Sequence, residues 1–296
     1  MRKILLTGKN GQVGWELQRT LAPLGRVIAL DSSGLDLADV DAIRRKVREI
    51  RPHIIVNPAA HTAVDKAESE PELAMAINGV APGVFAEEAK KLDALLVHYS
   101  TDYVFDGSKQ GAYREDDAPN PLGVYGKSKL AGEQAIRAAG CNHLILRTSW
   151  VYGARGKNFL LTMLRLAKER SELRIVDDQI GAPTWCRSLA EITAQILAQL
   201  YMPGASEEDM ARVSGTYHLT SSGSVSWHGF AAEILRLAAV QPTPRLVAIP
   251  SREYPTPAAR PLNSVLSNDK LLHTFGLQAG GWQENLQLCM QERGSS

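Results

Sequence analysis

The sequence predicts an α/β fold, in which a doubly wound parallel sheet is followed by a smaller α/β lobe. Short apolar segments alternate with segments of helical periodicity through the first half of the chain, as in β-α-β units. A glycine-rich turn, Gly8–Gly14, lies directly after the first apolar segment. Polar residues follow several other apolar segments, at the edge of a parallel sheet where ligands bind. Together these observations predict a Rossmann-type sheet.

The expected elements of the first half follow one another in strand–helix order. Strands are predicted at 2–7, 26–30, 53–57, 94–99 and 144–147. Helices are predicted from residue 13, at 40–50, at 71–92 and from residue 125. Pro82 marks a break or a new first turn within the third of these helices. Residues 1–150 are therefore expected to form the ligand-binding sheet domain.

Residues 151–296 are expected to form mainly a second lobe, with some segments returning to the first domain. Helices are predicted at 159–170, 189–200 and 227–239, the last capped by Ser226, and a strand at 217–220. Residues 242–261 contain six of the fifteen prolines, which predicts an extended, stiff segment. The last residues, 294–296, are expected to fray.

Composition favours a cytoplasmic enzyme without nucleic-acid or membrane partners. The 296 residues carry a formal net charge of +1 with both signs interspersed, so no basic face for nucleic acid is expected. No apolar stretch approaches the roughly twenty residues of a membrane helix, and the first strand leaves no room for a signal peptide. The three cysteines are odd in number and lack metal-ligand spacing, which favours free thiols in a reducing compartment.

The glycine turn is typical of a dinucleotide site. Its spacing is Gly-x-x-Gly-x-x-Gly, between a strand and the start of a helix whose free N–H groups suit a pyrophosphate. Asp31 ends the second strand about twenty residues later, where an acidic residue is expected to meet the adenosine ribose. An acid here favours NADH over NADPH, but Lys9 and Ser32 can soften that preference, so both cofactors stay open.

Tyr125 and Lys129 stand four residues apart and therefore share one face of a predicted helix. A tyrosine is a weak acid, with an unperturbed pKa of about 10. A nearby ammonium stabilises the phenolate, so we expect Lys129 to lower the pKa of Tyr125 and allow proton exchange near neutrality. Taken alone, the pair is more typical of a helical surface than of a catalytic site.

Taken together, these residues resemble the extended branch of the short-chain dehydrogenase/reductase superfamily, whose members act on nucleotide sugars. Within that branch the chain is most similar to the reductases that complete dTDP-L-rhamnose synthesis. The resemblance covers nearly the whole chain and is specific through the shared order of its segments: 8–15, 57–68, 98–105, 125–133, 147–153, 178–184 and 254–266.

The resemblance implies an NADPH- or NADH-dependent reduction of the 4-keto group of a dTDP-sugar. Tyr125 is implied as proton donor, Lys129 as its electrostatic partner and ribose ligand, and Thr101 as a hydrogen-bond donor to the substrate carbonyl. The implied cofactor-binding residues are Gly8, Asn10, Gly11, Gln12, Val13, Asp31, Asp36, Leu37, Ala60, His61, Thr62, Tyr99, Tyr125 and Lys129. The implied substrate-binding residues are Thr101, Asp102, Tyr103, Tyr125, Trp150 and Arg260, although Trp150 also suits a core position.

Three alternatives compete with this hypothesis. The related 4,6-dehydratases carry an Asp-Glu pair after the threonine, where this chain has Asp102-Tyr103, and an unperturbed tyrosine is too weak an acid to supply that base. Epimerases of the same superfamily are disfavoured only by the wider resemblance. A non-catalytic regulatory subunit is expected to lose the threonine, tyrosine and lysine that are present here.

Assembly is left between a monomer and a homodimer. Some members of the family place acidic residues around Mg²⁺ at a dimer contact. This chain has Arg187 where one of those acids is expected, although Glu16 and Glu292 remain. A bridging Mg²⁺ is therefore not expected, and the chemistry itself requires no metal.

Overall fold

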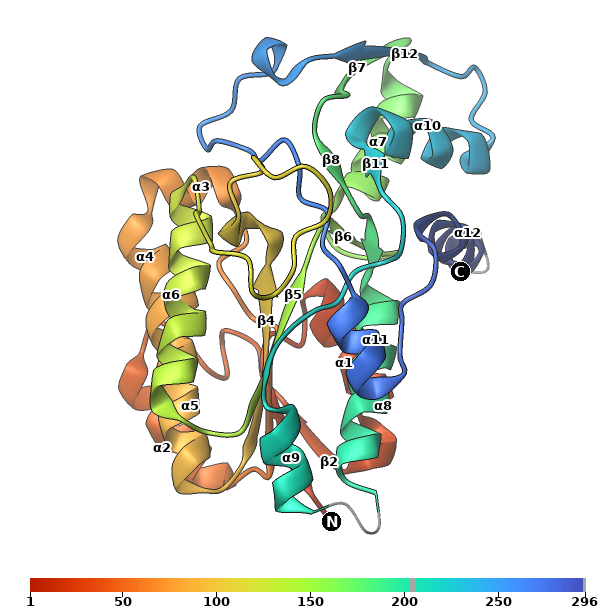
Figure 1. Ribbon diagram of the computed structural model, residues 1–296. Coiled ribbons are helices and arrows are strands. Elements are labelled where there is room, and N and C mark those ends of the chain that lie inside the picture. The colour runs from red at the N-terminus through yellow and green to blue at the C-terminus, as the bar shows by residue number, and fades with distance from the viewer. Residues whose placement is uncertain (203–205, 295–296) are drawn as a thin grey trace.

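Six parallel strands form the central sheet, in the order β10-β5-β4-β3-β1-β2 (Figure 1). The computed structural model describes residues 1–202 and 206–294. The strands are β1 (Lys3–Leu6), β2 (Arg26–Ala29), β3 (Ile54–Asn57), β4 (Leu95–Thr101), β5 (His143–Thr148) and β10 (Gly215–His218). Strand order reverses between β1 and β3, and in open α/β sheets ligands bind beyond the carboxyl ends of the strands at such a switch point.

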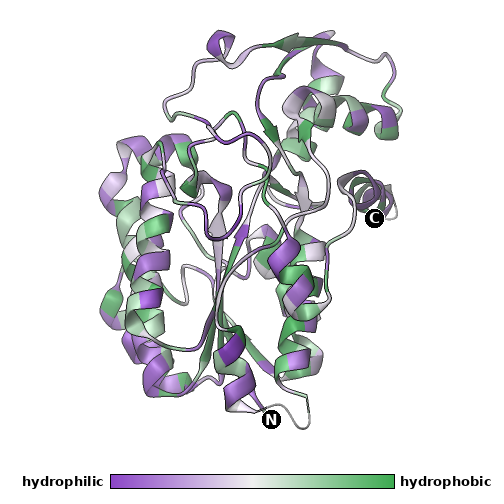
Figure 2. Cartoon of the chain, in the orientation of Figure 1, coloured by the Kyte–Doolittle hydropathy of each residue, from purple (hydrophilic) through white to green (hydrophobic). Residues whose placement is uncertain are grey.

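Helices cover both faces of this sheet (Figure 1). Helices α1 (Gln12–Thr20) and α8 (Cys186–Leu200) pack on one face, with α9 (Glu207–Val213) and α11 (Asp269–Phe275) contributing to the same core. Helices α2 (Val40–Ile50), α5 (Ala81–Lys91) and α6 (Val124–Ala139) cover the other face. Figure 2 shows mostly hydrophobic strands between helices whose outer surfaces carry hydrophilic residues. The predicted doubly wound parallel sheet is confirmed.

The helix predicted at 71–92 is interrupted rather than continuous. It consists of α4 (Pro71–Met75), the π-helical segment η2 (Ala76–Val80) and α5, with Pro82 in the first turn of α5. Short helix α3 (Val64–Ser69) precedes it. The wider π turn places the fully buried Asn78 so that its amide donates to Ser128 Oγ of α6 over 3.1 Å.

The second lobe is built from short, separate strand pairs. They are β7 (Glu172–Val176) with β12 (Arg245–Ile249), β8 (Ile180–Gly181) with β11 (Val225–Ser226), and β6 (Val151–Tyr152) with β9 (Thr184–Trp185). Helices α7 (Phe159–Glu169), α10 (Trp227–Ala238) and α12 (Trp282–Gly294) share one hydrophobic core with them. The proline-rich segment expected to be merely extended therefore contains a paired strand, β12. Strand β10 lies in the central sheet although it follows this lobe in the chain.

Local sequence signals explain several helix ends. The Ser226 side chain accepts a hydrogen bond from Gly229 N over 3.0 Å, which confirms the predicted cap of α10. Helix α12 continues through Gly294, and Ser295 and Ser296, where fraying was expected, lie outside the described residues. Three short 3₁₀ segments complete the fold: η1 (Ala22–Leu24), η3 (Asp102–Val104) and η4 (Ser251–Glu253).

None of the helices in the described part of the chain combines the length and the apolar character needed to cross a bilayer. Cys141, Cys186 and Cys289 are buried free thiols, as the odd count predicted.

Candidate active site

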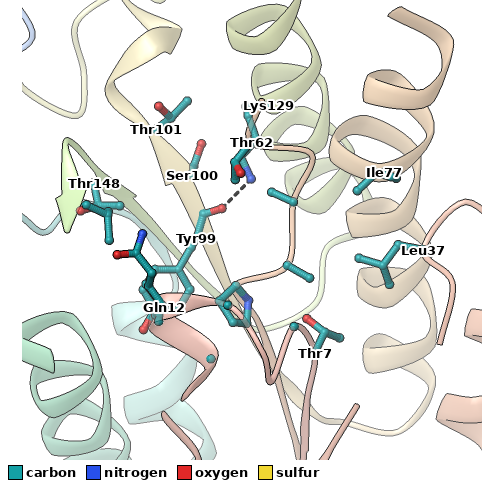
Figure 3. Close-up of a pocket in the computed structure, with 18 of the residues that line it drawn as sticks. Thr7, Gln12, Leu37, Thr62, Ile77, Tyr99, Ser100, Thr101, Lys129 and Thr148 are labelled. Carbon is teal, nitrogen blue, oxygen red and sulfur yellow. Dashed lines mark hydrogen bonds between the residues drawn. The ribbon is translucent and has the colours of Figure 1, made fainter. Parts of the chain in front are cut away.

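A cavity of about 730 Å³ opens at the carboxyl ends of β1, β3, β4 and β5 (Figure 3). All the site residues expected from the sequence line it except His61 and Arg260. The lining set is Gly8, Asn10, Gly11, Gln12, Val13, Asp31, Asp36, Leu37, Ala60, Thr62, Tyr99, Thr101, Asp102, Tyr103, Tyr125, Lys129 and Trp150. Segments far apart in the sequence thus meet in one crevice.

The glycine turn lets three chain segments approach closely at the floor of the cavity. Gly8 has φ +62° and a Cβ there would lie 3.0 Å from Ala59 Cβ in the loop after β3. A Cβ on Gly14 would lie 2.1 Å from Gly8 O, so α1 can begin this close to the turn only with glycine. Helix α1 starts after Gly11 without a side-chain cap, which leaves its first N–H groups directed at the cavity edge.

Asp31 lies at the rim of the cavity beside a compensating cation. Its Oδ2 is 3.2 Å from Lys9 Nζ and accepts from Asn10 Nδ2 over 3.1 Å. The Ser33 hydroxyl donates to Oδ1 over 2.7 Å. These contacts, that of Ser33 first and of Lys9 next, hold the pKa of Asp31 well below its usual range. The acid is therefore ionised, but its charge is shared with a lysine.

Lys129 projects from α6 into the middle of the cavity wall, where only 2% of it is exposed. Its ammonium donates to Tyr99 O over 2.6 Å, as Figure 3 shows, and lies 3.1 Å from His98 Nε2. Burial lowers the pKa of Lys129 to about 8, and the carboxylate of Glu133 on the same helix acts in the opposite direction.

Tyr125 opens α6 at the other side of the cavity, one turn before Lys129. Its ring meets Tyr103 edge to face, with centroids 5.5 Å apart. Burial raises the pKa of Tyr125 to about 12, and a hydrogen bond with Thr101 acts the other way. The sequence led us to expect that Lys129 lowers this pKa, but burial is the largest influence here and has the opposite sign.

Thr101, Asp102 and Tyr103 follow one another where β4 passes into η3. Thr101 Oγ1 donates to Asp102 Oδ1 over 2.9 Å and accepts from Tyr103 N over 3.2 Å. Burial raises the pKa of Asp102 to about 6. The pKa of Tyr103 is also raised above its ordinary value, first by burial and then by the Asp102 charge. Tyr103 is therefore a weaker acid than a free tyrosine.

Trp150 forms the wall nearest the second lobe. It has φ +47°, an uncommon backbone conformation for a bulky residue, and its indole stacks on Trp227 of α10 with centroids 3.5 Å apart. A Cβ on Gly181 would lie 2.4 Å from the Trp150 ring, so glycine is required beneath it. Sequence reasoning missed Trp227 and Gly181 as supports, because neither lies near Trp150 in the chain.

Comparison with known proteins places this geometry in a family. The sequence matches the RmlD substrate binding domain family over residues 1–294. The chain belongs to that family. It is 50% identical over 296 residues to a dTDP-4-dehydrorhamnose reductase of Burkholderia thailandensis, and 48% identical over 298 residues to one of Escherichia coli, with at least 97% of each chain covered.

Solved structures give the same result. A dTDP-4-dehydrorhamnose reductase from Bacillus anthracis in complex with NADP is 37% identical, with a TM-score of 0.90 over 98% of this chain and 99% of that one. A UDP-glucose 4-epimerase of Thermus thermophilus in complex with NAD shares 19% identity at a TM-score of 0.79, which shows a common fold only.

This RmlD-family protein fits a dinucleotide by its own geometry. The glycine turn leaves a cradle that a Cβ would fill, and the N-terminus of α1 faces it. Asn10, Gln12 and Asp31 line the same side, while Tyr125 and Lys129 lie at the far end. Thr7, Ser100, Ser149 and Lys157 also line the cavity and were not among the individual site residues inferred from the sequence. Three of them, Thr7, Ser100 and Ser149, lie at or just beyond the carboxyl ends of strands. That position was the sequence signal that could have identified them.

Two expected residues lie beside the cavity rather than in its lining. The backbone N–H of His61 donates to Asn78 Oδ1 over 2.8 Å, and its ring lies 3.1 Å from Glu70. Arg260 pairs with Asp65 at 2.9 Å and lies over the Tyr103 ring at 5.8 Å from its centroid. Both side chains therefore contact carboxylates of the protein: His61 contacts Glu70, just after α3, and Arg260 contacts Asp65 of α3.

A single guanidinium, that of Arg187, bridges the acidic pair considered for a metal. Arg187 Nε lies 3.2 Å from Glu16 and its Nη2 lies 2.6 Å from Glu292. Within the described ranges, no group of three or more His, Cys, Asp or Glu side chains is arranged to hold a metal ion. The residues around Arg187 therefore do not fit a bridging Mg²⁺.

Proposed function

We propose that this protein reduces the 4-keto group of dTDP-4-dehydro-L-rhamnose to give dTDP-L-rhamnose, with NADPH or NADH as cofactor. The proposal is supported by near full-length relatives that are dTDP-4-dehydrorhamnose reductases. The single observation that carries it is the meeting of Thr101, Tyr125 and Lys129 at the end of a cavity whose other end is a glycine cradle.

A reduced nicotinamide, when bound, supplies hydride to the keto carbon. Tyr125 is the proton donor to the oxygen that gains charge, and a positioned acid of this kind contributes about 10²- to 10⁴-fold. In the proposed complex Thr101 donates its hydroxyl proton to the same oxygen instead of to Asp102 Oδ1, its present acceptor, and this hydrogen bond stabilises the developing charge. Lys129 supplies positive charge on the cofactor side.

Reduction is favoured over dehydration by the state of Tyr103. A dehydratase needs a base at this position, and burial together with the Asp102 charge moves the pKa of Tyr103 upward, away from the ionised form. Tyr103 instead serves as an apolar wall against the Tyr125 ring.

The direct test mixes purified protein with dTDP-4-dehydro-L-rhamnose and each reduced cofactor, and follows the nicotinamide absorbance. Loss of that absorbance with formation of dTDP-L-rhamnose is expected. Tight cofactor binding without turnover of any 4-keto sugar would contradict the proposal and favour a non-catalytic subunit.

We further propose that the enzyme acts in the cytoplasm, and that any dimer it forms has no metal between Glu16 and Glu292. The Arg187 contacts support the second point. Sedimentation equilibrium with and without a chelator should give the same mass, whereas dissociation by the chelator would refute it.

A further inference from the structure

A buried row of polar side chains connects Lys129 to the central sheet. Lys129 Nζ lies 3.1 Å from His98 Nε2, and His98 Nδ1 lies 3.1 Å from Asn57 Nδ2. Thr7 Oγ1 donates to Asn57 Oδ1 over 2.6 Å. All four residues are at most 2% exposed. His98 and Asn57 are fully buried, so each depends on its neighbours for hydrogen bonds, whereas Lys129 and Thr7 end the row at the lining of the cavity.

The sheet itself sets the spacing of this row. His98 and Asn57 are register partners on β4 and β3, and Thr7 follows β1, the next strand. Lys129 Nζ is held at its end by a second acceptor, the carbonyl of Tyr99 on β4. The position of the ammonium is therefore tied to three adjacent strands rather than to α6 alone.

A neutral imidazole offers one N–H donor and one lone-pair acceptor. An ammonium only donates, so charged Lys129 requires the lone pair on His98 Nε2 and places the ring proton on Nδ1. A neutral Lys129 amine can accept, so the ring can then carry its proton on Nε2 and accept from Asn57 at Nδ1. The Asn57 amide and the Thr7 hydroxyl each contain a donor and an acceptor, so both can serve either direction.

The surroundings lower the pKa of both groups, so that His98 stays neutral and Lys129 loses its proton at mildly alkaline pH. Burial and the Lys129 charge hold the pKa of His98 well below its usual range. Burial lowers the pKa of Lys129 to about 8, against the opposing effect of Glu133. Glu133 is itself paired with Arg147 of β5, at 2.7 Å. Arg137 of α6 lies 3.3 Å from the same carboxylate, and Tyr125 and Asp102 line the cavity together with Lys129.

We infer that His98 is a positioning residue, which holds Lys129 in one place in both of its protonation states by exchanging the ring proton between Nδ1 and Nε2. A lysine so held keeps its distance to Tyr125 and the cofactor while protons move at the site. The link to turnover rests on the proposed reductase function, but the tautomer exchange does not.

Nitrogen-15 NMR of histidine-labelled protein tests the exchange without any turnover. One ring, identified by its loss in His98→Gln, should change from the Nδ1–H to the Nε2–H form with a midpoint near pH 8. The change should be absent in Lys129→Met. A single tautomer from pH 6.5 to 9.5, or a change that persists in Lys129→Met, would overturn the inference.

The kinetic test compares two substitutions of similar size. His98→Phe removes the hydrogen bond to Lys129 in both protonation states. The bond to the charged form is the stronger by about 1 kcal/mol, so the alkaline limb of kcat should move to lower pH by about 0.7 unit. His98→Gln supplies a new acceptor, so the alkaline limb of kcat should return to its wild-type pH. KM for the sugar should be unchanged in both variants. Equal losses of kcat at every pH in both variants would indicate a structural role only and contradict the inference. Failure of the wild-type protein to reduce any 4-keto sugar would instead refute the proposed function and leave the NMR result intact.

Discussion

The two halves of the cavity are built in different ways. The cofactor half consists of backbone: a glycine turn, a helix N-terminus and the ends of adjacent strands in one continuous sheet. The proposed sugar half consists of side chains, chiefly Trp150, in the turn between β5 and β6, stacked on Trp227 at the start of α10. A binding surface made of backbone tolerates few substitutions. Where side chains form the surface, a single substitution can change the affinity for the ligand without disturbing the fold.

The sharpest contrast is expected at Gly14. In Gly14→Ala the new Cβ would meet Gly8 O at 2.1 Å, so the turn and α1 must separate. Loss of one backbone hydrogen bond to a charged pyrophosphate costs about 1.5–3 kcal/mol, so we expect dinucleotide affinity, measured by calorimetry, to fall by roughly 10- to 10²-fold.

Gly34→Ala is the matched control, because a Cβ there finds ordinary contacts of 3.4 Å or more. Its affinity should stay within twofold of the wild type. Equal dinucleotide affinities for the Gly14 and Gly34 variants would show that binding does not depend on the close backbone approach at Gly14.

The sugar half should respond in KM rather than in cofactor binding. Trp227→Ala removes the ring on which Trp150 stacks and frees its strained backbone to relax. Loss of an aromatic pair worth about 1 kcal/mol predicts a severalfold rise in KM for the dTDP-sugar, with NADPH affinity unchanged.

Trp227→Phe retains a stacking surface and should recover most of the wild-type KM. A variant whose NADPH affinity fell together with its sugar affinity would break the proposed division between the halves.

The smallest effect is expected from the ion pair between Lys9 and Asp31 in the proposed cofactor half. Lys9→Met leaves the ionised Asp31 without its cation, so the 2′-phosphate of NADPH is repelled while NADH is not. An exposed pair of this kind is worth at most about 1 kcal/mol, so the NADPH/NADH affinity ratio should fall by about threefold to fivefold.

Lys9→Arg keeps the charge and should keep the ratio. If the ratio rose in Lys9→Met, Asp31 would not face the ribose as we propose.

This difference in construction also explains what the sequence could predict. The glycine turn, Asp31 and the Tyr125–Lys129 spacing are local patterns, and they identified residues that line one cavity as well as the start of α6. Trp227, Gly181 and the His98–Asn57 row depend on contacts between distant segments, for which a single sequence carries no local signal. The direction of the Tyr125 pKa shift was missed for the same reason, since it depends on burial of the phenol and on the charge of Asp102, which together outweigh the hydrogen bond with Thr101.

The central claim is that Tyr125 donates the proton in a reduction by NADPH or NADH. The most direct measurement is kcat for dTDP-4-dehydro-L-rhamnose in the wild type and in Tyr125→Phe, with cofactor affinity measured in parallel. We predict a loss of about 10²- to 10⁴-fold in kcat and an unchanged affinity for the cofactor. A kcat within a fewfold of the wild type would contradict the account.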